Sequence, residues 1–219
     1  MKVMTWNIRL GIQEGLDAII EEIRTHNPDI LALQEVGRHW KMGPPGDTTT
    51  SIASALGYFG SFAPCIVEDQ HEYGHALLSR WPIEKAEVIQ LPQDVDEPRA
   101  LLYSEVAHPE LKLKILSTHL SYIDDRALQA PVLLNSVRDR KPHLVLGDLN
   151  ADDEPWLLEM DDLLNRAEQP LATYPTPEPR LNLDYLFSAG MWKEAQRLDT
   201  GESSDHYAVL GVLELPTFS

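Results

Sequence analysis

Short apolar runs bounded by turn residues constrain the fold of this chain more than any other feature. Lys2–Asn7, Ile30–Val36 and Leu144–Leu146 are too short for buried helices and are typical of buried strands. Further strands are expected where β-branched and apolar residues lie between proline and charged turns. These are Tyr58–Pro64, His75–Ser79, Ala86–Leu91, Leu101–Val106, Leu113–Ser117, Leu183–Phe187, Lys193–Arg197 and Ala208–Glu214.

Helical periodicity appears between these runs. The segments predicted to be helices are Leu16 to the stop at Asn27–Pro28, Thr50–Leu56, Asp125–Arg138 and Trp156–Leu164. Pro131 is expected to kink or shorten the third of them. Strands and helices alternate at first, but strands follow one another in the middle of the chain, which favours a mixed sheet layered with helices. Two packed sheets covered by helices would accommodate these strands.

Composition indicates a single globular domain over residues 1–219. With 43% hydrophobic and 24% charged residues the chain can bury a full core. No linker, charge block or internal repeat marks a domain boundary. The one cysteine, Cys65, excludes an internal disulfide and is expected to be a buried strand residue.

Neither a signal peptide nor a membrane span is expected. The start, MKVMTWNIRLG, is too short and too polar for a signal peptide. Thr48–Val67 is the longest uncharged stretch, and its Thr, Ser, Gly and Pro content makes it too polar to cross a bilayer. We therefore expect a cytoplasmic protein without a transmembrane segment. The sequence indicates no protein partner.

The net charge of −17 bears on the substrate. An acidic surface repels polyanions, so tight nonspecific binding to nucleic acid is disfavoured. Part of the negative charge can instead be gathered in a cleft that binds a cation. The charge therefore weakens the case for a nucleic-acid substrate without excluding one.

Polar side chains interrupt the chain where several predicted strands begin or end. They are Asn7, Glu35, His119, Asp148, Asn150, Asp184, Asp205 and His206. A single Asp after a strand is usually a turn or helix cap. Strand ends converge at one edge of a sheet, however, and a series of such residues there predicts a shared pocket.

These residue types suit a hard divalent cation and a phosphate. Mg²⁺ takes oxygen ligands from one or two carboxylates, water and substrate phosphate, and histidine and asparagine can donate to phosphate oxygens. HExxH, CxxC and Cys/His clusters are missing from the sequence, which argues against zinc. Nucleotide-cradling glycine loops and a GxSxG elbow are missing as well.

The motifs TWNIR, LQEV, STHLS, GDLNA, LDYLF and SSDHY, in this order, resemble the endonuclease/exonuclease/phosphatase superfamily. The resemblance extends from Asn7 to His206. It implies a four-layer α/β sandwich in which helices flank two packed mixed β-sheets. It also implies a phosphoester hydrolase that uses Mg²⁺, with Mn²⁺ as a substitute, and that attacks phosphorus with water.

The resemblance assigns the metal side of the site to three residues. Glu35 would be the principal metal ligand, and Asn7 and Asp205 would complete this side directly or through water. In some nucleases of this group an acidic residue stands two positions after the first Asn, whereas this chain has Arg9. One metal ion or two therefore stays open.

The resemblance assigns the catalytic side to five residues. Asp148 would orient or deprotonate the attacking water, and Asn150 would hold that water or a phosphate oxygen. His206 would contact the scissile phosphate with support from Asp184. His119 would contact a phosphate oxygen from the other side.

Four further residues are candidates for substrate binding. His75 stands where relatives often have Asn, and it either faces the phosphate or is a buried structural histidine. Arg99 either points at substrate or is a solvated charge at a strand entry. Arg38, which follows the predicted metal ligand, and Arg180, in the Pro-rich stretch TYPTPEPR, either rim the cleft or lie in solvated loops.

A phosphodiesterase acting on a small or lipid-derived diester is the leading functional prediction, because extended basic or aromatic-interleaved segments are missing from the sequence. An endonuclease or exonuclease on DNA or RNA is the alternative. A non-catalytic binding module with the same fold is the third hypothesis, and it would require loss of the metal or water-activating residues.

Overall fold

Two six-stranded β-sheets form the centre of the computed structural model, which describes residues 1–168 and 172–214. The first sheet has the order β11 (Met191–Arg197), β12 (Val209–Glu214), β1 (Lys2–Asn7), β2 (Ile30–Arg38), β4 (His71–Ser79), β3 (Phe59–Glu68). The second has the order β5 (Ile83–Gln90), β6 (Ala100–Ala107), β7 (Lys112–His119), β8 (Leu144–Asp148), β10 (Asp184–Ser188), β9 (Asn165–Arg166).

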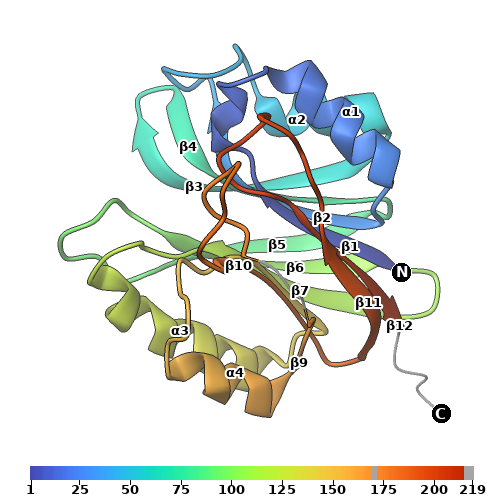
Figure 1. Cartoon of the computed structure of the whole chain (residues 1–219), viewed down its shortest axis with the longest axis vertical. Helices are drawn as coiled ribbons and strands as arrows, with labels where there is room; N and C mark the ends of the chain where they lie inside the picture. The colour runs from blue at the N-terminus through green and yellow to red at the C-terminus, as the bar shows by residue number, and fades with distance from the viewer. Residues whose placement is uncertain (169–171, 215–219) are drawn as a thin grey trace.

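Helices cover the outer faces of both sheets (Figure 1). On one side lie α1 (Leu16–His26) and α2 (Thr48–Leu56), and on the other lie α3 (Asp125–Arg140) and α4 (Trp156–Leu163). The result is a sandwich of four layers, helix, sheet, sheet, helix. This confirms the fold predicted from the sequence.

Each sheet contains one parallel pair, and its other pairs are antiparallel. In the first sheet β1 and β2 are parallel and joined through α1, and in the second β7 and β8 are parallel and joined through α3. Both sheets are therefore mixed. The parallel pairs end in register at polar residues: Asn7 lies opposite Gln34, and His119 lies opposite Asp148.

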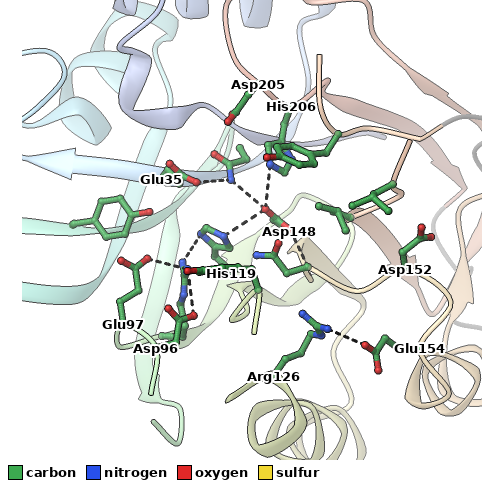
Figure 2. A pocket seen from close by; sticks show the side chains of 18 residues that line it. Glu35, Asp96, Glu97, His119, Arg126, Asp148, Asp152, Glu154, Asp205 and His206 are labelled. Carbon is green, nitrogen blue, oxygen red and sulfur yellow. Dashed lines mark hydrogen bonds and ion pairs between the residues drawn. The ribbon is translucent and has the colours of Figure 1, made fainter. Parts of the chain in front are cut away.

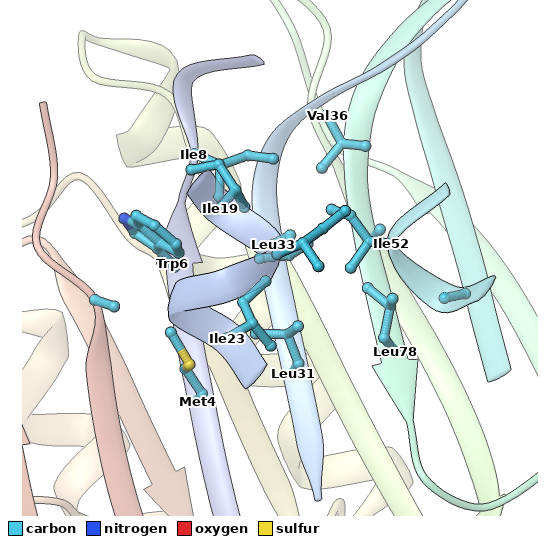
Figure 3. Close-up of a cluster of buried hydrophobic side chains, with 14 of the residues drawn as sticks. Met4, Trp6, Ile8, Ile19, Ile23, Leu31, Leu33, Val36, Ile52 and Leu78 are labelled. Carbon is cyan, nitrogen blue, oxygen red and sulfur yellow. The ribbon is translucent and has the colours of Figure 1, made fainter. Parts of the chain in front are cut away.

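Three apolar layers hold the sandwich together. Side chains alternate along each strand, so Val3 lies in the core between the sheets, while Met4 lies in the core between the first sheet and its helices. Figure 3 shows this outer core, where Trp6 and Leu33 of the sheet pack near Ile19 and Ile52 of α1 and α2. A matching core lies under α3 and α4.

Some elements differ from the sequence prediction. The helix α3 is not shortened at Pro131, because Pro131 and Ala127 lie on its exposed face, where water can bind the carbonyl that lacks an N–H partner. The 3-10 helix η1 (Arg9–Gly11) and the two-residue strand β9 were not predicted. Cys65 is buried in β3, as expected. Across residues 1–168 and 172–214, every helix is too short or too polar to cross a bilayer.

Candidate active site

The strand ends of the two sheets meet at a cavity of about 610 Å³. Among the residues predicted for the site, its lining includes Asn7, Glu35, Arg99, His119, Asp148, Asn150, Asp205 and His206. Asp184 is fully buried and contacts His206. Figure 2 shows Glu35, His119, Asp148 and His206 directed toward one another from separate segments of the chain.

Asn7 connects the two sheets within this cavity. Its Nδ2 donates to Glu35 Oε1 at 3.0 Å and to Asp148 Oδ2 at 3.1 Å. Its own position is held because Ser204 Oγ donates to the Asn7 carbonyl at 2.7 Å. A single amide therefore joins a carboxylate of the first sheet to a carboxylate of the second.

Glu35 lies in an irregular part of β2. The register of β2 against β4 shifts between Leu33 and Val36, and Glu35 has a φ of 52°. A left-handed conformation in a non-glycine residue costs about 1–3 kcal/mol and often occurs at functional sites. A bulge of this kind redirects a side chain out of the regular alternation, and here the half-buried carboxylate lines the cavity.

Asp148 lies at the centre of the polar contacts. Its Oδ1 accepts from the Asn150 backbone N–H at 2.9 Å, and its Oδ2 lies 3.4 Å from His119 Nε2 and 3.7 Å from His206 Nε2. Burial, and next the negative charge of Asp184, raise the pKa of Asp148 to about 7. A carboxyl group with this pKa can exchange a proton near neutral pH.

His206 and Asp184 form a buried pair, with His206 Nδ1 and Asp184 Oδ2 2.9 Å apart. Burial alone would lower the pKa of His206, but the carboxylates of Asp184 and Asp148 outweigh it and raise the pKa to about 10. Trp6 Nε1 donates to the His206 carbonyl at 2.9 Å, and the Tyr174 ring centroid lies 4.7 Å from that of His206. The ring is therefore fixed in place and cationic at neutral pH.

His119 lies on the other side of Asp148 in a different electrostatic environment. Arg99 Nη1 donates to His119 Nδ1 at 2.8 Å. Burial, followed by the positive charge of Arg99, lowers the pKa of His119 well below its ordinary value. One neutral and one cationic imidazole therefore flank the same carboxylate.

The cavity offers oxygen donors that suit a hard divalent cation. They come from Glu35, Asn7, Asp148 and Asp205, and the Asp205 carboxylate also lies 3.4 Å from Arg9 Nε. Ligand atoms of a second group, Asp148, Asp184 and His206, lie within 4.8 Å of one another.

The second group is the less suitable of the two. His206 Nδ1 and Asp184 Oδ2 already share a hydrogen bond, so a cation between them would have to displace its proton. The first group, around Glu35, offers oxygen atoms from carboxylates and an amide, and oxygen is the ligand atom that Mg²⁺ and Mn²⁺ prefer.

The structure does not bring three of the predicted substrate-binding residues to the cavity. Among the described residues, its lining lacks His75, Arg38 and Arg180. His75 is fully buried in β4, which fits its structural alternative. Arg38 pairs with Asp47 at 3.0 Å and also with Glu72, and the Arg180 side chain is 77% exposed.

Several residues of the cavity were not predicted. The cavity is also lined by Tyr174 of the Pro-rich stretch TYPTPEPR and by Asp96, Glu97, Tyr73, Tyr122, Arg126, Asp152, Glu154, Leu181 and Leu183. Ser204, which holds Asn7 in place from outside the lining, could have been found, since it belongs to the SSDHY motif. For Glu97, the sequence offered only one weak indication of a place in the cavity, namely its position two residues before the candidate Arg99.

A four-layer α/β sandwich with buried carboxylates, amides and imidazoles around one cavity defines the class: metal-dependent phosphoric ester hydrolases. The profile described as Endonuclease/Exonuclease/phosphatase family matches residues 4–206, and the chain belongs to this family. Its members include phosphoesterases, nucleases and phosphatases.

Individual relatives are distant. The chain is 28% identical over 211 residues to the uncharacterized protein YbhP of Escherichia coli, covering 85% of this chain and 83% of that one. An endonuclease/exonuclease/phosphatase from Beutenbergia cavernae superimposes with a TM-score of 0.80 at 25% identity, over 98% of this chain and 71% of that one. The human Nocturnin catalytic domain superimposes with a TM-score of 0.73 at 24% identity, over 98% of this chain and 93% of that one.

Proposed function

We propose that the chain hydrolyses phosphodiesters by attack of water on phosphorus, with Mg²⁺ as its cation and Mn²⁺ as a substitute. The observation that carries the proposal is Asp148, buried between a cationic and a neutral histidine and joined through Asn7 to Glu35. Glu35, Asn7 and Asp205 would hold the cation. When bound, it would offset negative charge on the phosphoryl oxygens.

The protein side chains have separate tasks in this proposal. Asp148 orients the attacking water and takes its proton, a role supported by its pKa of about 7. His206, held by Asp184, donates to the phosphoryl group, and His119 donates from the opposite side. The Nδ2 of Asn150 donates to the Leu120 carbonyl at 2.9 Å, and this contact orients its Oδ1 to accept from the water.

The charges of the cavity support a small or lipid-derived diester as substrate. Arg99 is paired with Glu97 at 2.9 Å, and Arg126 is paired with Glu154 at 2.9 Å. The lining also contains Asp152 without a basic counterpart among the ion pairs of the described residues. Such a cavity accommodates one phosphate at the cation but repels a polyanion along its rim.

A nuclease is the second candidate. Tyr122, which is 63% exposed, and Tyr174 both line the cavity and offer aromatic faces on which a base could stack. This favours a flexible single strand over a duplex, because stacking requires an unpaired base.

A substrate panel tests the proposal. With Mg²⁺ present, wild type and Asp148→Asn are assayed in parallel on a glycerophosphodiester, phospholipid head groups, single-stranded RNA, abasic-site DNA and supercoiled plasmid. We expect wild type alone to turn over the small or lipid-derived diesters and to leave the plasmid intact. Faster cleavage of RNA or DNA than of every small diester would overturn the substrate class in favour of a nuclease.

A further inference from the structure

Arg99 is a buried arginine in the cavity whose contacts are made within the protein. Its side chain is 4% exposed, and it lies just before the first residue of β6. Nη1 lies 2.8 Å from His119 Nδ1, and Nη2 lies 2.9 Å from Glu97 Oε1 and 4.0 Å from Asp96 Oδ2. The guanidinium therefore joins two carboxylates to one ring nitrogen.

The contact between Arg99 and His119 fixes a proton. A guanidinium has only donor N–H groups and stays protonated in proteins. His119 Nδ1 must therefore accept, and the single proton of a neutral imidazole must lie on Nε2. That nitrogen lies 3.4 Å from Asp148 Oδ2, on the cavity side of the ring.

The loop before β6 keeps the guanidinium in place. Asp96 Oδ2 accepts from Ser121 Oγ at 2.5 Å. The carboxylate of Asp125, the first residue of α3, accepts from the backbone N–H groups of Asp94 and Asp96, both at 2.9 Å. These contacts tie the loop that carries Asp96 and Glu97 to the helix, and they hold in place the carboxylates that pair with Arg99.

We propose that Arg99 is a positioning residue that locks His119 in its neutral Nε2–H tautomer, so that His119 serves as a hydrogen-bond donor and not as a base. The consequence for the reaction rests on the proposed function, in which His119 contacts a phosphoryl oxygen. With Nε2 carrying the proton, the ring has no free lone pair toward the cavity, and removal of the water proton falls to Asp148. Arg99 thus acts through His119 and not by binding the phosphate.

The protonation of the two His119 ring nitrogens in wild type tests the proposed tautomer directly. Long-range proton–nitrogen NMR on uniformly ¹⁵N-labelled protein at pH 7, with His119→Gln to assign the signals, reports which nitrogen carries the proton. We expect Nδ1 in the range of an unprotonated ring nitrogen and Nε2 in the protonated range. An imidazolium, an Nδ1–H tautomer or a rapidly averaged pair of signals would overturn the proposal, whether or not any variant folds.

A paired variant tests the consequence for catalysis. Arg99→Gln combined with Glu97→Gln removes the guanidinium together with its nearest carboxylate and leaves Asp96 hydrogen-bonded to Ser121 Oγ. It replaces the fixed donor with an amide that can donate or accept. We expect mixed His119 tautomers and a fall in kcat of about tenfold or more, with KM changed by less than about threefold. The matched control is Arg140→Gln with Glu87→Gln, a pair at 2.6 Å outside the cavity lining, which should behave as wild type.

Failure of the positioning role and failure of the proposed function would give different results. If the paired variant raises KM while His119 keeps the Nε2–H tautomer, Arg99 binds substrate and the proposed positioning role is wrong. If wild type hydrolyses no phosphoester, the proposed function fails, but the ring-nitrogen spectrum of wild type still decides the tautomer assignment.

Discussion

His75 illustrates how burial changes the protonation of a single residue. It is fully buried in β4, with Nε2 3.2 Å from the Ser117 carbonyl and Nδ1 3.9 Å from Cys65 Sγ. Burial lowers the pKa of His75 from 6.5 to about 4, although the Ser117 carbonyl opposes the shift. Because neither neighbour is a carboxylate, no anion compensates a proton on this ring.

The shift at His75 predicts acid sensitivity. Between pH 6.5 and 4 the unfolded chain binds a proton at this residue and the native protein does not, so the free energy of unfolding decreases as the pH falls. The loss due to His75 should approach about 3 kcal/mol by pH 4. Urea unfolding of wild type and His75→Asn from pH 7 to 4 should show a smaller loss in the variant. The exposed control His39→Asn should keep the wild-type pH dependence, and equal slopes in all three proteins would contradict the prediction.

At the same scale, the sequence indicated which polar residues line the cavity better than it indicated which groups they contact. Glu35, Asp148 and His206 stand at or beside the ends of predicted strands, and their pattern carries the motif resemblance. The hydrogen bond from Trp6 Nε1 to the His206 carbonyl could not be predicted, because it joins residues 200 positions apart and depends on the pairing of β1 with β12. Arg99 was a candidate, but the sequence does not say that its guanidinium meets His119.

At the scale of elements, Gly147 decides how closely β8 approaches β7. Its φ is 150°, and a Cβ built on it would lie 2.0 Å from the Thr118 carbonyl oxygen. Gly57, at the end of α2, has a φ of 70° and open space around it. Gly147 therefore combines a steric clash with an unfavourable φ, whereas Gly57 has only the unfavourable φ.

Alanine substitutions at these two glycines should differ in their effect. Gly147→Ala forces backbone atoms apart beside Asp148, and we expect a loss of about 3 kcal/mol or more, together with loss of activity. Gly57→Ala adds only left-handed strain, which costs about 1 kcal/mol. Thermal unfolding monitored by circular dichroism measures both, and similar losses in the two variants would contradict the steric account.

The extent to which elements were predictable follows from their length and burial. β1, β2 and β8 appear near their predicted positions because their apolar runs are continuous. β9 has two residues, Asn165 and Arg166, and is set by pairing with β10, so it carries no local pattern. The bulge that turns Glu35 into the cavity is likewise a property of pairing between strands, and periodicity along one strand does not encode it.

At the scale of the whole molecule, the core between the sheets should carry much of the stability. Leu146 of β8 is fully buried in that core, whereas Leu158 of α4 is 68% exposed. Leu146→Ala should lower the free energy of unfolding by about 2–5 kcal/mol, and Leu158→Ala should change it by less than about 0.5 kcal/mol. Chemical denaturation of the two variants side by side measures the difference. Comparable stabilities would mean that the sheets do not pack as described.

The sandwich also brings Glu35 of one sheet and Asp148 of the other to a single cavity, 113 residues apart in the chain but linked through Asn7. The most direct test of this arrangement is the rate of bis(p-nitrophenyl) phosphate hydrolysis as a function of Mg²⁺ concentration. Wild type should require Mg²⁺ and lose activity in EDTA. Asp148→Asn should lower kcat by about 100-fold or more at saturating Mg²⁺, and Glu35→Gln should raise the Mg²⁺ requirement by about tenfold or more. Undiminished turnover in EDTA, or in Asp148→Asn, would contradict the account.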